Sequence, residues 1–273
     1  MLGLSTTRGT SSLGWCRVRR ECRVTPAEPL ALPCNVHREL LLKKLREVVE
    51  RTRCSCIALS GGIDTSVIAA VARGTGIGLR GYTVIYTEGV PRDLPYADRV
   101  ARALGMELRV IRIGRGFVGE AIPVVRRCIS VEPDYIELRN DVVFYAALLR
   151  AREDGCSCIY TGSGGDEIFA GYSFLLTLGS ERLEELRARY AYCGRYPELE
   201  IARCLGVEVV APYLSKEVLE TALRIPITCL RTGVLRGKEI LREILDDLGL
   251  HTIASRVKAP AESGAGTDVL IRL

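Results

Sequence analysis

The sequence predicts an α/β protein with a doubly wound parallel sheet, followed by a mostly helical C-terminal extension. From Cys54 to Tyr160, short apolar segments rich in β-branched residues alternate with segments of helical periodicity. The connections are long enough for right-handed crossovers between parallel strands. Beyond Tyr172 the pattern becomes mostly helical, and Pro212 and Pro226 interrupt it.

The predicted elements follow one another at regular intervals. Strands are expected at 54–59, 80–86, 107–113 and 156–160. Helices are expected at 36–52, with Asn35 as its N-cap, and at 65–73, 94–104, 117–130 and 140–153. The extension is expected to hold helices at 181–193, 196–205, 215–223 and 236–247.

The chain is expected to contain one domain after a short N-terminal arm. Residues 1–35, which are rich in Gly, Ser and Thr near their start, show no sustained period and predict a partly irregular arm. The domain spans 36–273, and its helical part begins near residue 175.

Composition places the chain among ordinary globular proteins, since 48% of its residues are apolar and 26% are charged. No apolar run reaches the roughly 18 residues that cross a bilayer, and the first twenty residues lack the apolar centre of a signal peptide. We therefore expect a cytoplasmic protein without a membrane partner. The net charge of +5 is modest and spread along the chain, which argues against a nucleic-acid partner.

Eleven cysteines is a high number for such a protein. None form a CxxC pair, which excludes zinc-ribbon spacing. Cys-Ser-Cys occurs twice, at 54–56 and 156–158, each time at the start of a predicted strand. Two interpretations stay open: small buried apolar residues, or a cross-strand disulfide of the kind that intracellular proteins of hyperthermophiles contain.

The segment with the most chemical content lies between the first predicted strand and the next helix. It reads Ser60-Gly61-Gly62-Ile63-Asp64-Thr65-Ser66. Two glycines allow the backbone to approach an anion, and the following helix offers free N–H groups. Asp64 is suited to Mg²⁺ rather than to phosphate, and the loop lacks the Lys of a Walker motif. A tight Gly-Gly turn without a ligand is the structural alternative.

A second glycine-rich segment, from Thr161 to Tyr172, follows the fourth predicted strand. The carboxyl ends of neighbouring parallel strands open onto one crevice, so Asp166 could hold the same Mg²⁺ as Asp64. The alternative for Asp166 and Glu167 is capping of a helix N-terminus, which acidic residues favour.

These two segments resemble the signatures of the asparagine synthetase family, in its C-terminal synthetase domain rather than its glutaminase domain. Three further segments match it in order: 206–214 with Gly-Val-Glu and Pro-Tyr-Leu, 237–242 with Gly-Lys and Leu-Arg, and 256–260 with a lysine before Ala-Pro. The resemblance runs from residue 37 to 268. It implies an adenine nucleotide alpha hydrolase-like fold of the ATP pyrophosphatase (PP-loop) type.

The resemblance also implies a role for each matched position. The adenosine positions are Leu59, Val84, Thr161 and Gly162. The pyrophosphate positions are Ser60, Gly61, Gly62, Asp64, Thr65 and Ser66, with Thr65 replacing the more usual Ser. Asp64 and Asp166 match the Mg²⁺ carboxylates, while Lys258 and Lys238 match basic catalytic residues near the phosphates. The implied cofactors are ATP and Mg²⁺.

The implied reaction is the ATP-dependent formation of an amide, with AMP and pyrophosphate as products. A carboxylate, aspartate first among the candidates, is adenylated and then attacked by ammonia or another amine. Two alternatives stay open: a PP-loop tRNA-modifying or sulfur-transfer ATPase, and a non-catalytic nucleotide-binding paralogue. Homo-oligomer formation is open as well.

Two departures from the family pattern affect the second substrate. Leu2 follows Met1 where glutamine-dependent members have a catalytic Cys, so we expect free ammonia, another amine or a separate glutaminase subunit. Ser163 replaces the Glu of the asparagine synthetases and the Tyr of the β-lactam synthetases, and serine is a poor general base. The sequence around 139–141 also differs, and Glu137 or Asp141 are candidate bases.

Overall fold

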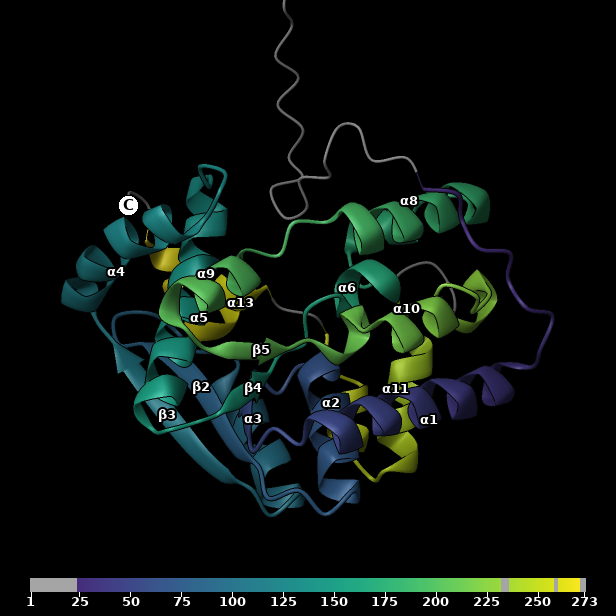
Figure 1. The fold of residues 1–273 in the computed structure, drawn as a ribbon, viewed down its shortest axis with the longest axis horizontal. Coiled ribbons are helices and arrows are strands. Elements are labelled where there is room, and N and C mark those ends of the chain that lie inside the picture. Colours follow the sequence, from purple (N-terminus) through teal and green to yellow (C-terminus); the bar gives the residue numbers. More distant parts are fainter. Residues whose placement is uncertain (1–23, 232–235, 258–259, 271–273) are drawn as a thin grey trace, which may run out of the picture.

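A five-stranded sheet in the order β3-β2-β1-β4-β5 forms the centre of the molecule (Figure 1). The structure is a computed structural model that describes residues 24–231, 236–257 and 260–270. The strands are β1 (Cys56–Ala58), β2 (Arg80–Tyr86), β3 (Glu107–Ile113), β4 (Cys158–Tyr160) and β5 (Glu208–Val210). All four pairings are parallel. Because winding proceeds outward from β1 to β3 and then from β4 to β5, the topological switch point lies between β1 and β4.

Helices cover both faces of the sheet and enclose two apolar cores (Figure 1). One core contains side chains from α1 (Cys34–Thr52), α2 (Ile63–Gly74), α3 (Leu94–Ala103), α8 (Ser180–Cys193), α10 (Lys216–Ala222) and α11 (Glu239–Asp247). The other contains side chains from α4 (Arg115–Cys128), α5 (Tyr135–Glu153) and α9 (Pro197–Leu205). This arrangement confirms the predicted α/β fold class.

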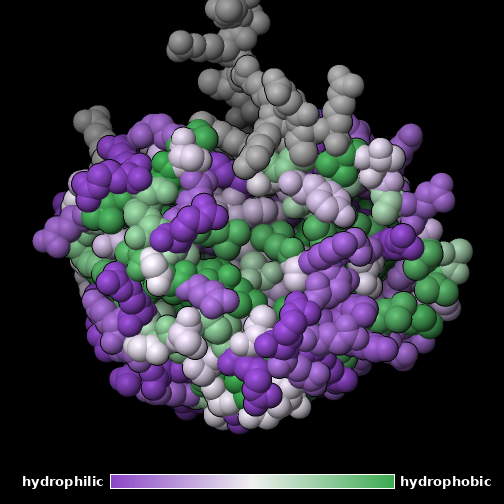
Figure 2. Space-filling model, in the orientation of Figure 1, coloured by the Kyte–Doolittle hydropathy of each residue, from purple (hydrophilic) through white to green (hydrophobic). Residues whose placement is uncertain are grey.

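Helix α1 illustrates how the sequence produces this layering. Leu41, Leu45 and Val48 recur at helical spacing and are buried, whereas Lys43 and Arg46 between them are exposed. Figure 2 shows hydrophilic residues over this helix. The prediction of Asn35 as N-cap was wrong, because the helix begins at Cys34 after an extended Pro33, whose fixed φ suits the residue before a helix.

Helix α5 begins at Tyr135, five residues before the predicted start at residue 140. The reason is a capping box, in which Asp134 Oδ1 accepts hydrogen bonds from the backbone N–H of Ile136 and of Glu137, both at 2.9 Å. In return, Glu137 Oε2 accepts the Asp134 N–H at 3.1 Å. The Asp-x-x-Glu spacing was present in the sequence and was missed.

The C-terminal half is mostly helical, as predicted, but it also completes the sheet. Strand β5 was not predicted; it is only three residues long and pairs with β4. The remaining helices are short: α6 (Gly165–Ile168), α7 (Ser173–Leu176), α12 (His251–Ala254) and α13 (Ala261–Ala265), with 3₁₀ turns at Pro212–Leu214, Ile227–Cys229 and Thr267–Val269. The predicted arm at 1–35 lies mostly outside the described residues, and residues 24–33 contain no helix or strand.

Arg187 fastens this half of the chain to the segment after β4. Its side chain is 1% exposed, and its guanidinium donates to the carbonyls of Ile168 at 2.6 Å, Ala222 at 2.9 Å and Ile225 at 3.3 Å. Three carbonyls compensate in part for burying the charge, although desolvation still lowers the pKa of Arg187 to about 10. Helix α8 is thereby tied to α6 and to the end of α10.

All nine cysteines in the described ranges are disulfide-bonded. Four of the disulfides are Cys34–Cys229, Cys54–Cys158, Cys56–Cys156 and Cys128–Cys204, and Cys193 is bonded as well. The two Cys-Ser-Cys motifs pair with each other, which confirms the cross-strand interpretation. Two covalent links therefore join the β1 and β4 segments where these strands begin.

None of the helices in the described part of the chain combines the length and the apolar character that crossing a bilayer requires. The cytoplasmic location stays a prediction.

We predict that at most two of the eleven cysteines react with a maleimide when the protein is denatured without reductant, and all eleven after reduction. Each closed loop of 76 to 195 residues should contribute about 2–4 kcal/mol to the free energy of unfolding. Full reduction should therefore lower the denaturant midpoint substantially. An unchanged midpoint, or more than two reactive thiols before reduction, would contradict the pairing.

Candidate active site

A cavity of about 770 Å³ opens where the loops after β1 and β4 meet. Residues from both loops line it, together with residues of α5, α9, the segment before α11 and the segment before α13. Its volume lies within the usual range for small-molecule sites, and its place is the switch point of the sheet, where α/β proteins bind ligands.

The loop after β1 is organised by its own hydroxyl groups. Ser60 Oγ accepts the Gly62 N–H at 3.2 Å and lies 3.3 Å from Thr65 Oγ1. Helix α2 begins at Ile63 directly behind this turn, so the first N–H groups of the helix have no intrahelical acceptor. Twelve residues of helix then add a partial positive charge at the same end. The arrangement is suited to a phosphate or pyrophosphate anion.

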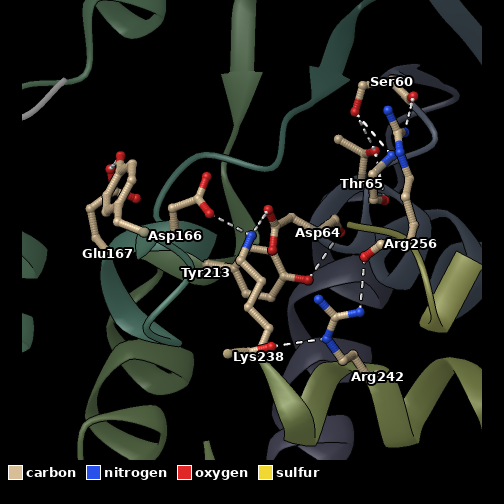
Figure 3. A network of polar contacts seen from close by, with 12 residues as sticks. Ser60, Asp64, Thr65, Asp166, Glu167, Tyr213, Lys238, Arg242 and Arg256 are labelled. Carbon is tan, nitrogen blue, oxygen red and sulfur yellow. Dashed lines mark hydrogen bonds and ion pairs between the residues drawn. The ribbon is translucent and has the colours of Figure 1, made fainter. Parts of the chain in front are cut away.

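Lys238 brings the two predicted metal carboxylates together (Figure 3). Its ammonium group donates to Asp64 Oδ2 and forms an ion pair with Asp166 Oδ1 at 2.8 Å. Lys238 is 4% exposed. Burial alone lowers the pKa of Lys238, but the carboxylates of Asp166 and Asp64 outweigh that effect and raise it above the usual lysine value.

Glycines make this close approach sterically feasible. A methyl group on Gly165 would lie 2.4 Å from the carboxyl carbon of Asp64. One on Gly171 would lie 2.0 Å from Asp166 Oδ1 and 2.3 Å from Lys238 Cε. Lys238 itself has φ = 61°, a left-handed conformation that costs energy for a residue with a side chain. The backbone is thus held in an unfavourable conformation where the three charges meet.

The donor set fits Mg²⁺ bound together with a nucleotide. Two carboxylates that reach one ammonium group can reach one cation, and their oxygens are the hard ligands that Mg²⁺ prefers. In the described ranges, no cluster of three or more His, Cys, Asp or Glu side chains could hold a metal alone. Mg²⁺ commonly takes one or two carboxylates and completes its shell with phosphate oxygens and water.

Two arginines connect the segment before α11, the segment before residue 258 and the phosphate loop (Figure 3). Arg242 donates to the Gly237 carbonyl at 2.9 Å and to the Arg256 carbonyl at 3.0 Å. Arg256 donates to the Ser60 carbonyl at 3.0 Å and pairs with buried Asp93. The segment that precedes residue 258 is thereby held against the phosphate loop. Lys258 lies outside the described residues; its described neighbours Val257 and Pro260 line the cavity.

The predicted nucleotide positions divide into two groups. Those that line the cavity are Leu59, Ser60, Gly62, Asp64, Thr65, Val84 and Gly162. Gly61, Ser66 and Thr161 are not among the lining residues. Gly61 packs against the start of α3, Ser66 is fully buried in α2, and the Thr161 hydroxyl lies 2.8 Å from Ser163 Oγ. The role of these three residues in nucleotide binding stays a prediction.

Ser163 contacts a carboxylate from a distant part of the chain. Its hydroxyl donates a hydrogen bond to Glu198 Oε1 from the first turn of α9. Desolvation raises the pKa of Glu198 to about 7, although the hydrogen bond from Ser163 opposes the rise. Sequence reasoning missed Glu198, because 35 residues separate the pair and nothing local marks the contact.

The two bases expected from the sequence have different surroundings. Glu137 lines the cavity, but one of its oxygens is engaged in the capping box of α5. Asp141 is 3% exposed and lines the same cavity. Burial and the charge of Glu198 raise the pKa of Asp141 to about 8. Asp141 is therefore largely protonated near neutral pH in the ligand-free protein.

We predict that Asp141→Asn stabilises the ligand-free fold, and increasingly so as the pH rises. A carboxyl group whose pKa rises on folding costs stability once it ionises in the unfolded chain, so the cost begins near pH 4 and levels off above about pH 8. Denaturant unfolding at pH 4, 6 and 8 measures the difference. A variant less stable than the wild type at pH 8 would contradict this account of the site.

The chain is similar to proteins of a known family. The model of the family described as asparagine synthase matches residues 37–199. The chain is 28% identical to a provisionally assigned glutamine-hydrolyzing asparagine synthetase of Methanocaldococcus jannaschii, over 79% of this chain and 46% of that protein. It is also 28% identical to the glutamine-hydrolyzing asparagine synthetase B of Escherichia coli, over 77% of this chain and 41% of that protein.

A second group of relatives carries a different name. The chain is 28% identical to a 7-cyano-7-deazaguanine synthase of Anaeromyxobacter dehalogenans, over 62% of this chain and 82% of that protein. The chain thus spans less than half the length of the two asparagine synthetases but most of this shorter relative.

Proposed function

The chain belongs to the asparagine synthase family, and from this premise we propose that it is an ATP-dependent ligase that forms an amide, AMP and pyrophosphate. The observation that carries the proposal is that Asp64 and Asp166 both contact the ammonium group of Lys238 beside the phosphate loop. A carboxylate substrate, with aspartate as the first candidate, is adenylated in this cavity. ATP-dependent activity of the PP-loop class is what the family and its relatives share.

In the first half-reaction, an oxygen of the substrate carboxylate attacks the α-phosphorus and pyrophosphate leaves. The N-terminus of α2 and the hydroxyls of Ser60 and Thr65 hold the leaving pyrophosphate. Mg²⁺, when bound with ATP by Asp64 and Asp166, supplies positive charge at the phosphates. Lys238 lies between these two carboxylates. We propose that Lys258 stabilises the negative charge that develops at the α-phosphate, because its motif matches that of the family's catalytic lysine.

In the second half-reaction, an amine attacks the carbonyl carbon of the acyl-adenylate and AMP leaves. The attacking nitrogen must lose a proton, and Glu198 is placed to take it. Its pKa of about 7 suits a general base near neutral pH, and Ser163 holds its carboxylate in place. Glu198 thus supplies the basic group that serine at position 163 cannot.

The source of the attacking amine is also part of the proposal. We expect free ammonia, another amine or a separate glutaminase subunit to provide it. The similarity to a 7-cyano-7-deazaguanine synthase favours a second candidate, in which the activated carboxylate belongs to a heterocyclic compound. A nucleotide-binding paralogue without activity is the remaining alternative.

We predict ATP–pyrophosphate exchange that depends on a carboxylate substrate, with aspartate the first to test in a panel that includes heterocyclic carboxylic acids. Lys258→Ala should slow exchange by about 10²–10³-fold while nucleotide binding stays measurable, because it removes charge stabilisation at the reacting phosphate. Lys216→Ala is the matched control, since this lysine is exposed and does not line the cavity.

Exchange with a heterocyclic acid but not with aspartate would support the second candidate. ATP binding without exchange for any carboxylate would contradict the ligase proposal, and full exchange by Lys258→Ala would remove that residue from the mechanism.

We predict that Glu198→Gln leaves exchange nearly unchanged but slows amide formation from the preformed acyl-adenylate by about 10²–10⁴-fold. In the wild type this second step should rise with pH through about 7, as Glu198 becomes ionised. Ser163→Ala removes a hydrogen bond that favours the ionised form, so it should move this rise to higher pH. Single-turnover measurements over pH 5–9 test both; an unchanged pH profile in Glu198→Gln would exclude Glu198 as the base.

A further inference from the structure

One end of the cavity contains more negative charge than the proposed chemistry uses. Arg195, in the turn between α8 and α9, is surrounded by carboxylates from two helices, and we call this group the acid cluster. Its members are Glu137, Asp141, Glu198 and Glu200. Arg195 Nη1 lies 4.0 Å from Glu137 Oε2, and its Nε lies 4.0 Å from Glu200 Oε1.

Three members of the acid cluster have structural or catalytic partners. Glu137 accepts the Asp134 N–H in the capping box. Glu200 accepts the Ser130 N–H at 2.6 Å, and Glu198 accepts the Ser163 hydroxyl. These contacts explain the placement of three carboxylates, but they do not explain the fourth.

Asp141 is the member that the fold does not use. Its side chain is 3% exposed and lines the cavity, and its Oδ2 has no hydrogen-bond partner among the described residues. The guanidinium nitrogens of Arg195 also have none in the same ranges. A buried carboxylate oxygen without a donor costs free energy, so a group of this kind beside a cavity indicates a ligand that donates to it.

The charges around Asp141 indicate that this ligand is positively charged. One arginine faces four carboxylates, and the repulsion among them contributes to the raised pKa of Asp141 after burial itself. A cation at Asp141 would reverse this effect and let the carboxylate ionise. The neighbouring cavity wall includes Phe144 and Pro197, which suit the carbon skeleton of a small organic molecule.

We propose that Asp141 anchors a binding site for an ammonium group of a substrate. Because it concerns the same cavity, this inference rests on the proposed ligase function. The ammonium group can belong to the adenylated carboxylate, as the α-ammonium of an amino acid, or to the acceptor, as the second charge of a diamine. In either case the reacting nitrogen is a different one: it attacks the carbonyl carbon as a neutral amine, AMP leaves with the electron pair of the broken C–O bond, and Glu198 takes the one proton that the nitrogen loses.

The test compares substrates with and without this charge in the wild type and in Asp141→Asn. Exchange is measured with aspartate and with succinate, which lacks the ammonium group. Acyl transfer is measured with 1,3-diaminopropane and with hydroxylamine, which is uncharged near neutral pH. Losing a hydrogen bond between charged groups should lower kcat/KM by about 10- to 100-fold for the substrate that carries the ammonium, and by less than about threefold for its uncharged counterpart.

A selective loss with aspartate assigns the ammonium to the carboxylate substrate, and a selective loss with 1,3-diaminopropane assigns it to the acceptor. Equal effects on charged and uncharged substrates, or no effect on any of them, would overturn the proposal. Glu153→Gln is the matched control: this acid lies at the exposed end of the same helix and should change neither ratio.

Direct binding separates this inference from the ligase function. Calorimetric titration of the wild type, Asp141→Asn and Asp141→Ser with aspartate and with 1,3-diaminopropane needs no turnover. If exchange fails with every carboxylate, the ligase proposal fails, whereas about 10-fold weaker binding of either compound to both variants still supports the ammonium site. Equal binding to all three proteins would overturn it.

Discussion

The ammonium group of Lys238 is the interaction on which the active site depends. Asp64 and Asp166 come from different loops, and two carboxylates this close repel each other unless a cation lies between them. Lys238 supplies that charge from a third segment, just before α11, and accepts a left-handed backbone conformation to do so. Under the proposed function, Asp64 and Asp166 would also hold Mg²⁺ with ATP, and in the ligand-free protein the ammonium group of Lys238 keeps these two carboxylates together.

Several other contacts hold the three segments that carry Asp64, Asp166 and Lys238 in place. The disulfides Cys54–Cys158 and Cys56–Cys156 join the β1 and β4 segments where the strands begin, which fixes the two strands that lead into the loops of the site. Arg187 fixes the segment after β4, and Arg242 with Arg256 fixes the third segment against the phosphate loop. Each of these arginines donates to backbone carbonyls, which restrains the position of a chain segment whatever its side chains are.

Local patterns in the sequence were sufficient to predict many elements of this structure. The strands at Arg80–Tyr86 and Glu107–Ile113 have the predicted bounds, because their β-branched runs are long and have clear ends. The phosphate loop and Asp166 could be predicted because glycine, carboxylate and strand end occur together within a few residues. By contrast, β5 has only three residues and gains its stability from pairing with β4, a tertiary contact that no short window contains.

The same limit applies to the site itself. Glu198 contacts Ser163, which lies 35 residues away in the sequence, and Lys238 contacts Asp64, which lies 174 residues away. The packing of α9 and α11 brings these partners together, so sequence spacing could not identify them. The resemblance to a family identified Lys238 as a candidate catalytic residue, but it did not predict that Lys238 lies between Asp64 and Asp166. Asp141 was predicted as a candidate base, whereas its burial and its unpaired oxygen instead favour a role in binding.

The central claim is that Asp64 and Asp166 act on one cation, and a double-mutant cycle on the binding of Mn²⁺–ATP tests it most directly. Dissociation constants would be measured by electron paramagnetic resonance for the wild type, Asp64→Asn, Asp166→Asn and the double variant. If both carboxylates hold the same ion, the second substitution should cost much less once the first is present, with a coupling energy of at least about 1 kcal/mol. Strictly additive losses, or a loss in only one of the single variants, would contradict the shared site.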